Sequence, residues 1–134
     1  MELKELGRTG VMVPEIGLGT WKYSGGPAPL LRGIDLGANL IDTAEMYRTE
    51  DAVGQAIAGR RDEVFLATKV LGSHLRDDQV MRAADESLRR LAVDCIDLYQ
   101  IHWSNSSVPI AETMGAMEEL IDAGKVRYIG VSNF

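Results

Sequence analysis

The chain of 134 residues has the size of one ordinary domain. Its 46% hydrophobic and 25% charged residues are typical of a folded protein rather than a disordered one. The net charge of −6 argues against a nucleic-acid binder, because such proteins need clustered basic residues. One cysteine, Cys95, permits no internal disulfide, and no apolar run reaches the about 18–20 residues of a membrane span. We therefore expect a cytoplasmic protein with no membrane partner.

Short apolar runs alternate with longer amphipathic segments along the chain. The first segment, residues 3–16, predicts a β-hairpin around a glycine-containing turn. Strands are then predicted over residues 16–21, 39–44, 64–70, 96–103 and 126–134. Because these runs lack strict alternation of apolar and polar residues, they are typical of strands covered on both faces, as in parallel sheets.

The segments between the strands predict helices over residues 29–36, 49–58, 77–92 and 109–123. Helices between successive strands imply parallel pairing with right-handed crossovers. Two α/β architectures remain open, a doubly wound sheet and part of a (β/α)₈ barrel, which needs about 250 residues when complete. The expected residues capping the helix N-termini are Thr49, Asp77 or Asp78, and Ser106 or Ser107.

Polar residues stand near the C-terminal ends of the last four predicted strands. They are Asp42, Lys69, His102 and the pair Ser132-Asn133, with successive spacings of 27, 33 and 30 residues. Each spacing is about one βα repeat, and one repeat returns the chain to the same edge of a parallel sheet. These groups are therefore predicted to converge at the edge where α/β proteins place their ligands.

Each of these residues also has an ordinary structural interpretation. Lys69 can extend from an apolar strand to solvent, Asp42 can cap a turn, and a lone His102 more often packs in a core. Tyr47, five residues beyond Asp42, can equally be a packing residue. Taken together, Lys69 and Asp42 predict an ion pair, because each supplies the charge that the other lacks.

Other common sites are not supported by the sequence. Gly17-Leu18-Gly19-Thr20 lacks the third glycine of a dinucleotide fingerprint, and no clear helix follows it at once. The two histidines and one cysteine have no ligand spacing, so no metal is expected. No G-x-S-x-G motif indicates a serine nucleophile.

Four ordered motifs, LIDTAEMY, FLATKV, DLYQIHW and YIGVSNF, resemble those of the aldo-keto reductases, as do the hairpin and GLGTW before them. The resemblance covers essentially the whole chain. It implies a (β/α)₈ barrel with an N-terminal β-hairpin and metal-free interconversion of carbonyls and alcohols, mostly with NADPH. We expect residues 1–134 to be the N-terminal part of such a barrel, with the first five parallel strands and truncation after strand five.

The resemblance assigns a catalytic tetrad to Asp42, Tyr47, Lys69 and His102. The physical chemistry agrees, because hydride transfer to a carbonyl carbon builds negative charge on its oxygen and requires a proton donor. The Lys69 cation favours the phenolate of Tyr47 and so eases proton donation, while Asp42 fixes the lysine. Neutral His102 is expected to hydrogen-bond to the carbonyl oxygen and orient the substrate.

The same resemblance extends to the binding residues. Arg48 departs from the family pattern, since many relatives have glycine directly after the tyrosine. By resemblance, the cofactor-binding residues are Thr20, Asp42, Ser132 and Asn133, with the last two holding the nicotinamide carboxamide, and the substrate pocket includes Trp21 and Trp103.

The family's remaining strands supply most of the cofactor contacts, including those that select NADPH over NADH, so NADH is not excluded. The last predicted strand, residues 126–134, leaves an open parallel edge through which copies of the chain can associate. We therefore expect an NADPH-dependent reductase of small aldehydes or ketones. The alternative is a catalytically inactive barrel fragment or interaction module. A Schiff-base lyase is less favoured, because Asp42 keeps Lys69 charged.

Overall fold

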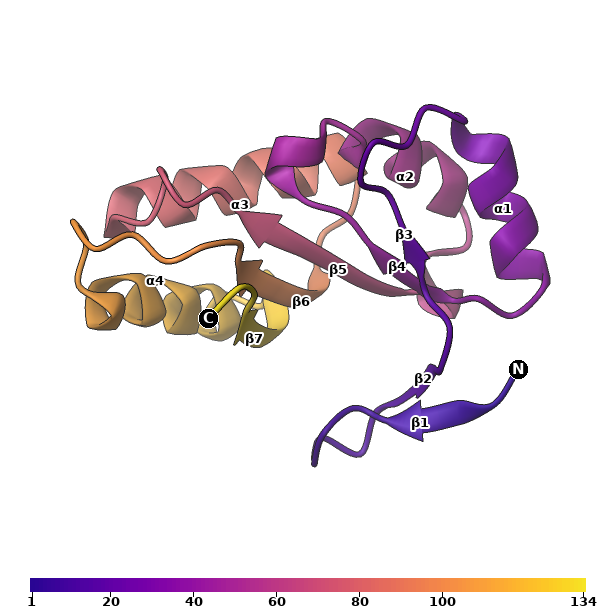
Figure 1. Cartoon of the computed structure of the whole chain (residues 1–134), viewed down its shortest axis with the longest axis horizontal. Coiled ribbons are helices and arrows are strands. Elements are labelled where there is room, and N and C mark those ends of the chain that lie inside the picture. Colours follow the sequence, from indigo (N-terminus) through magenta and orange to yellow (C-terminus); the bar gives the residue numbers. More distant parts are fainter.

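The computed structural model describes all of residues 1–134. A two-stranded antiparallel hairpin, β1 (Leu3–Glu5) and β2 (Met12–Pro14), precedes a five-stranded parallel sheet (Figure 1). The sheet contains β3 (Leu18–Gly19), β4 (Leu40–Asp42), β5 (Phe65–Val70), β6 (Ile96–Ile101) and β7 (Val126–Val131). The helices are α1 (Pro27–Asp35), α2 (Glu50–Ile57), α3 (Asp77–Leu91) and α4 (Ile110–Asp122), with 3₁₀ helices η1 (Glu45–Tyr47) and η2 (Arg61–Glu63).

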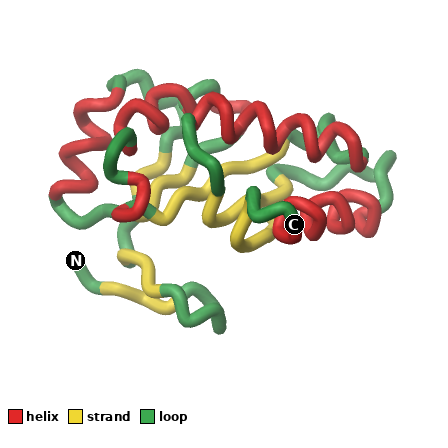
Figure 2. Tube along the Cα trace, turned by 180° about the vertical axis from the view of Figure 1, so that it is seen from behind, coloured by secondary structure: helices red, strands yellow, loops and turns green.

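The order of the strands decides between a doubly wound sheet and part of a barrel, the two architectures compatible with the βα order of the sequence. The sheet order is β3-β4-β5-β6-β7, so every strand pairs in parallel with its neighbour in the chain. A doubly wound sheet would reverse its order at a switch point. With right-handed crossovers, the sequential order places all four helices on one face of the sheet. Figure 2 shows the hairpin projecting away from this layer of helices. The sheet is therefore part of a barrel wall.

The hydrophobic core lies between the sheet and the helices. Every residue of β5 is buried, which explains why its sequence does not alternate. On β6, Tyr99 and Ile101 belong to the core cluster, whereas Leu98 and Gln100 are only half buried and face the open side. A cavity of about 530 Å³ separates that side from the hairpin turn, with Leu6 among its lining residues. The hairpin thus partly covers the open face of the sheet.

None of the three predicted capping interactions forms, although Thr49 does occupy the N-cap of α2. Helix α3 has Arg76 at its N-cap, and the Arg76 backbone N–H donates to Gln79 Oε1 at 3.2 Å. Asp77 and Asp78 instead occupy the first turn, where carboxylates interact favourably with the helix dipole. Helix α4 begins after Pro109, so neither Ser106 nor Ser107 caps it. Local residue preference predicts the start of a helix only in part, because tertiary packing also fixes the residue at which α3 and α4 begin.

Several strands are shorter than the sequence predicts. The predicted strand over residues 16–21 pairs only at Leu18–Gly19, and those over 96–103 and 126–134 end at Ile101 and Val131. His102 and Ser132 are therefore the first residues after their strands. This position gives their side chains the freedom to face a ligand while the strand fixes their backbone. None of the helices combines the length and apolar character that a membrane span requires.

Candidate active site

The polar residues predicted at the strand ends meet at one edge of the sheet. Asp42 ends β4, Lys69 is the second-last residue of β5, and His102 follows β6. The strand registers align these positions, since Asp42 lies opposite Ala67 and Lys69 lies opposite Gln100. The predicted convergence is thus present, at the C-terminal ends where barrels assemble their sites.

The Lys69 ammonium group is held by three acceptors. Its Nζ lies 2.7 Å from both Asp42 carboxylate oxygens and 3.0 Å from the carbonyl oxygen of Thr43. An ammonium group has three N–H donors, so all three are engaged. Because the Lys69 side chain is only 7% exposed, this arrangement is what allows a charge to be buried there. Lys69 therefore acts on its surroundings through its charge.

Tyr47 lies beside this buried cation and faces His102. The Lys69 Nζ is 5.1 Å from the centroid of the Tyr47 ring. The Tyr47 hydroxyl oxygen is 3.5 Å from His102 Nε2, and the two rings meet edge to face with centroids 5.4 Å apart. A separation of 3.5 Å makes a weak hydrogen bond, so both groups remain able to contact a ligand oxygen placed between them.

The environment of His102 favours the neutral form of its imidazole. Burial is the main cause that lowers the pKa of its imidazole from 6.5, and the positive charge of Lys69 lowers it further. Its Nδ1 is buried without a hydrogen-bond partner, so a proton there would be left unpaired. The neutral tautomer with its proton on Nε2 leaves only an acceptor lone pair at Nδ1 and directs an N–H donor toward Tyr47.

This environment predicts a pH effect on stability. Because folding lowers the pKa of His102, the unfolded chain binds a proton more readily below pH 6.5, and stability is lost as pH falls from 6.5 through the folded-state pKa. An NMR titration of the His102 ring should give a midpoint below 6.5, with His74→Gln used to assign the two ring signals. A midpoint at or above 6.5 would contradict the neutral assignment.

A pocket of about 410 Å³ opens in front of Tyr47 and His102. The Trp21 ring lies 5.0 Å from the Tyr47 ring, and the Trp103 ring stacks on the His102 ring at 3.7 Å. Both predicted pocket tryptophans therefore border the site. Met46, which the sequence does not single out, also lines this pocket, because it shares the short turn of η1 with Tyr47.

Ser132 and Asn133 extend the site beyond β7. The Ser132 N–H donates to the Ile101 carbonyl, which fixes the backbone next to His102. Asn133 Nδ2 donates to the His102 carbonyl at 2.9 Å and to Ser132 Oγ at 3.0 Å. Asn133 has a φ of 57°, a conformation that asparagine tolerates better than most residues. The Asn133 carbonyl oxygen and the Ser132 hydroxyl proton stay available, a pair that fits an amide group.

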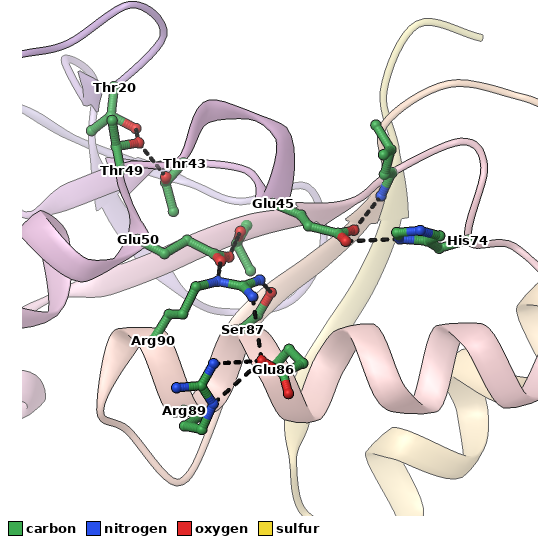
Figure 3. Close-up of polar contacts among 12 residues, drawn as sticks. Thr20, Thr43, Glu45, Thr49, Glu50, His74, Glu86, Ser87, Arg89 and Arg90 are labelled. Atoms are coloured by element: carbon green, nitrogen blue, oxygen red, sulfur yellow. Dashed lines mark hydrogen bonds and ion pairs between the residues drawn. The ribbon is translucent and has the colours of Figure 1, made fainter.

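Thr20 lies behind the site rather than on its surface. It is fully buried, and its hydroxyl donates to the Asp42 carbonyl at 3.1 Å. The Thr49 hydroxyl in turn donates to Thr20 and lies 3.0 Å from the Thr43 hydroxyl (Figure 3). Thr49 is at the N-cap of α2, but this network replaces the predicted cap. Direct cofactor contact by Thr20 stays a prediction, whereas its support of Asp42 is visible.

Two glutamates near the site are not singled out by the sequence. Glu50, 1% exposed, accepts from the Thr68 hydroxyl and from Arg90 Nε, each at 2.7 Å (Figure 3). Its position in the first turn of a helix suggests an exposed residue, and only the packing of α2 against α3 buries it. Glu45, within the LIDTAEMY motif, contacts the segment after β5.

Arg48 occupies a backbone conformation that favours glycine. Its φ of 57° places it in the left-handed region directly after η1. A side chain costs about 1–2 kcal/mol there, which glycine avoids. The Arg48 side chain is exposed and does not line the pocket in front of Tyr47. No group of three or more His, Cys, Asp or Glu residues lies in an arrangement that could hold a metal ion.

The Aldo/keto reductase family model matches residues 15–134, and the chain belongs to this family. The aldo-keto reductase YhdN of Bacillus subtilis is 41% identical over an alignment that covers all of this chain and 47% of that protein. The methylglyoxal reductase YeaE of Escherichia coli is 46% identical, with 92% of this chain and 46% of that protein covered.

Solved structures give the same result. The thermostable aldo-keto reductase Tm1743, in complex with the inhibitor epalrestat, superposes with a TM-score of 0.95 at 44% identity and covers all of this chain and 54% of that chain. An aldo/keto reductase from Klebsiella pneumoniae in complex with NADP and acetate gives 0.88 at 47% identity, with 92% and 47% covered. The five-stranded sheet is thus part of a (β/α)₈ barrel, and the chain spans about half the length of the relatives it matches.

Proposed function

We propose that these residues carry the proton-donating part of an NADPH-dependent carbonyl reductase, with small aldehydes or ketones as substrates. The observation that carries the proposal is the ion pair between the buried Lys69 and Asp42, which lies beside Tyr47, whose hydroxyl lies 3.5 Å from His102 Nε2. The similar protein from Escherichia coli is a methylglyoxal reductase, and the similar structure from Klebsiella pneumoniae contains NADP. Both support this chemistry.

Tyr47 is the proposed proton donor. A carbonyl oxygen placed between Tyr47 and His102 receives a hydrogen bond from each as negative charge develops on it. The Lys69 cation, 5.1 Å from the Tyr47 ring, stabilises the phenolate that remains after the proton leaves. Asp42 holds that cation in place without taking its charge away.

The residues after β7 fit the proposed cofactor. Ser132 and Asn133 offer a hydroxyl donor and a carbonyl acceptor beside His102, which is the complement of a nicotinamide carboxamide. When bound, the cofactor supplies the hydride, and the protein orients it. Trp21, Trp103 and Met46 provide apolar walls that exclude water from the reacting groups.

We also propose that residues 1–134 are the N-terminal part of a longer barrel. The family model and the relatives, about half of whose length is matched, support this. The alternative is an interaction module without catalysis. The observation in its favour is that β7 pairs with β6 on one side only, which leaves hydrogen-bonding groups free on the other.

Ligand binding separates these two functions. Titration with NADPH should quench the fluorescence of Trp21 and Trp103, which border the pocket, and methylglyoxal should then cause NADPH oxidation. Asn133→Leu should weaken NADPH binding, whereas Glu63→Ala, which removes an exposed ion pair with Arg60, should not. If neither NADPH nor methylglyoxal changes any signal of the wild-type chain, catalysis by these residues alone is ruled out, and the interaction module is favoured for residues 1–134 in isolation.

A further inference from the structure

Glu45 links the two segments that carry Tyr47 and Lys69. It is the first residue of η1, and Tyr47 is the last. One carboxylate oxygen of Glu45 accepts from the Leu71 backbone N–H at 2.9 Å, and the other lies 2.7 Å from His74 Nδ1 (Figure 3). Leu71 follows directly after β5, two residues beyond Lys69. Both carboxylate oxygens of Glu45 therefore contact the segment that follows β5, the strand that carries Lys69.

The receiving segment is itself well fixed. The His74 N–H donates to the Leu71 carbonyl at 2.8 Å, which closes a turn between the two residues that Glu45 contacts. One residue earlier, the carbonyl of Val70 accepts from the His102 N–H at 3.0 Å. The end of β5 is therefore joined to His102 on one side and to Glu45 on the other.

The 3₁₀ turn that Glu45 holds makes few backbone hydrogen bonds of its own. Helix η1 has three residues, and its N-cap, Ala44, makes no side-chain hydrogen bond. It is followed by Arg48 in the strained left-handed conformation. A single 3₁₀ turn has little stability of its own, because few hydrogen bonds offset the entropy of ordering it. Its position relative to β5 must come from tertiary contacts, and the Glu45 side chain, 17% exposed, supplies two of them.

We propose that Glu45 is a positioning residue that sets Tyr47 against Lys69 and His102. This inference rests on the proposed function, because the distance it controls matters only if Tyr47 donates a proton. Glu45 touches neither Tyr47 nor the pocket in front of it, so it acts through η1. Loss of the link allows Tyr47 to move away from His102 by the small distances that matter in catalysis.

Kinetics of Glu45→Ala test the proposal. We expect kcat for NADPH-dependent reduction to fall about 10- to 100-fold with KM little changed, because the walls of the pocket are kept. Glu45→Gln keeps an acceptor for the Leu71 N–H and should retain most of kcat. His74→Ala removes one of the two contacts and should fall between them. Glu63→Ala is the matched control for loss of a surface glutamate. If kcat falls equally in Glu45→Gln and Glu45→Ala, the proposal that Glu45 positions Tyr47 through hydrogen bonds is wrong, and the charge of Glu45 matters instead.

A structural readout keeps the test independent of turnover. The Tyr47 and His102 rings lie close enough for NOEs between their ring protons in the wild-type chain. Glu45→Ala should weaken those NOEs while the far-ultraviolet circular dichroism spectrum is unchanged. If the NOEs persist in Glu45→Ala, the proposal is wrong, whatever happens to kcat. If they weaken but a wild-type chain extended to the complete barrel shows no turnover, Glu45 positions Tyr47 and it is the proposed function that fails.

Discussion

Replacing Tyr47 with phenylalanine is expected to lower kcat for carbonyl reduction by about 10²- to 10⁴-fold, the range typical of a lost general acid. The ring of phenylalanine keeps the contacts with Trp21 and His102, so the pocket retains its shape. The affinity for NADPH should therefore be nearly unchanged. Turnover is measured by NADPH oxidation with methylglyoxal, and affinity by tryptophan fluorescence, on the same preparation.

The control for this prediction is Tyr128→Phe. Tyr128 lies on β7 and lines the cavity beneath the hairpin turn, away from the pocket in front of His102. Removing its hydroxyl should leave turnover unchanged. If Tyr47→Phe turns over as fast as the wild-type protein, Tyr47 is not the proton donor, and another residue must supply the proton.

Replacing Asp97 with alanine is expected to reduce the free energy of unfolding by about 3 kcal/mol, the largest effect on stability that we predict. The Asp97 carboxylate is 3% exposed and accepts three hydrogen bonds, from Arg61 Nη2 at 2.6 Å, the Leu66 N–H at 2.8 Å and Arg127 Nη1 at 2.8 Å. Alanine leaves the buried Leu66 N–H unpaired and removes the carboxylate that joins β5, β6, β7 and η2. Urea unfolding of both proteins measures the difference.

Two further variants define what this loss means. Asp97→Asn keeps the shape and one acceptor oxygen, so it should lose less stability than Asp97→Ala. Glu63→Ala, which removes an exposed ion pair, should leave the free energy of unfolding nearly unchanged. Since Asp97 lies near the start of β6, at the opposite end from His102, the NOEs between Tyr47 and His102 should survive. Equal losses in Asp97→Ala and Glu63→Ala would show that the buried carboxylate contributes no more than a surface one.

The parts of the site predicted from the sequence depend on a repeat. Lys69 lies near the end of one strand and His102 follows the next, about one βα repeat later. A regular βα order is therefore enough to bring them to one edge of the sheet. The ion pair between Asp42 and Lys69 follows from the cost of burying a lysine alone. The βα order alone leaves two architectures open, because strand order depends on pairing between distant segments. The prediction of the barrel, which the structure confirms, comes from the resemblance of the four motifs to the aldo-keto reductases.

The sequence does not predict the roles of Glu45, Glu50 and Asp97, because each contacts residues that are far away in the chain. Glu50 and Thr68 are 18 residues apart, Glu45 and His74 are 29 apart, and Asp97 and Arg61 are 36 apart. No spacing on a helix or strand face indicates such a pair. The one available signal was a charged residue inside an apolar run, as with Asp97 in IDLYQI, which predicts a buried partner without identifying it.

The three residues of η1 face different neighbours, and this arrangement affects how the substrate preference of the proposed enzyme can change. Glu45 faces the end of β5 and Tyr47 faces His102, whereas Met46 between them lines the pocket beside Trp21 and Trp103. The proposed proton donor Tyr47 and its neighbours Lys69 and His102 are thus fixed by strands and hydrogen bonds, while the walls of the pocket come from side chains outside the strands. For the proposed reductase, substitutions at the walls are expected to change which carbonyl compounds bind without displacing Tyr47, Lys69 or His102, which makes Met46 the first position to randomise in directed evolution.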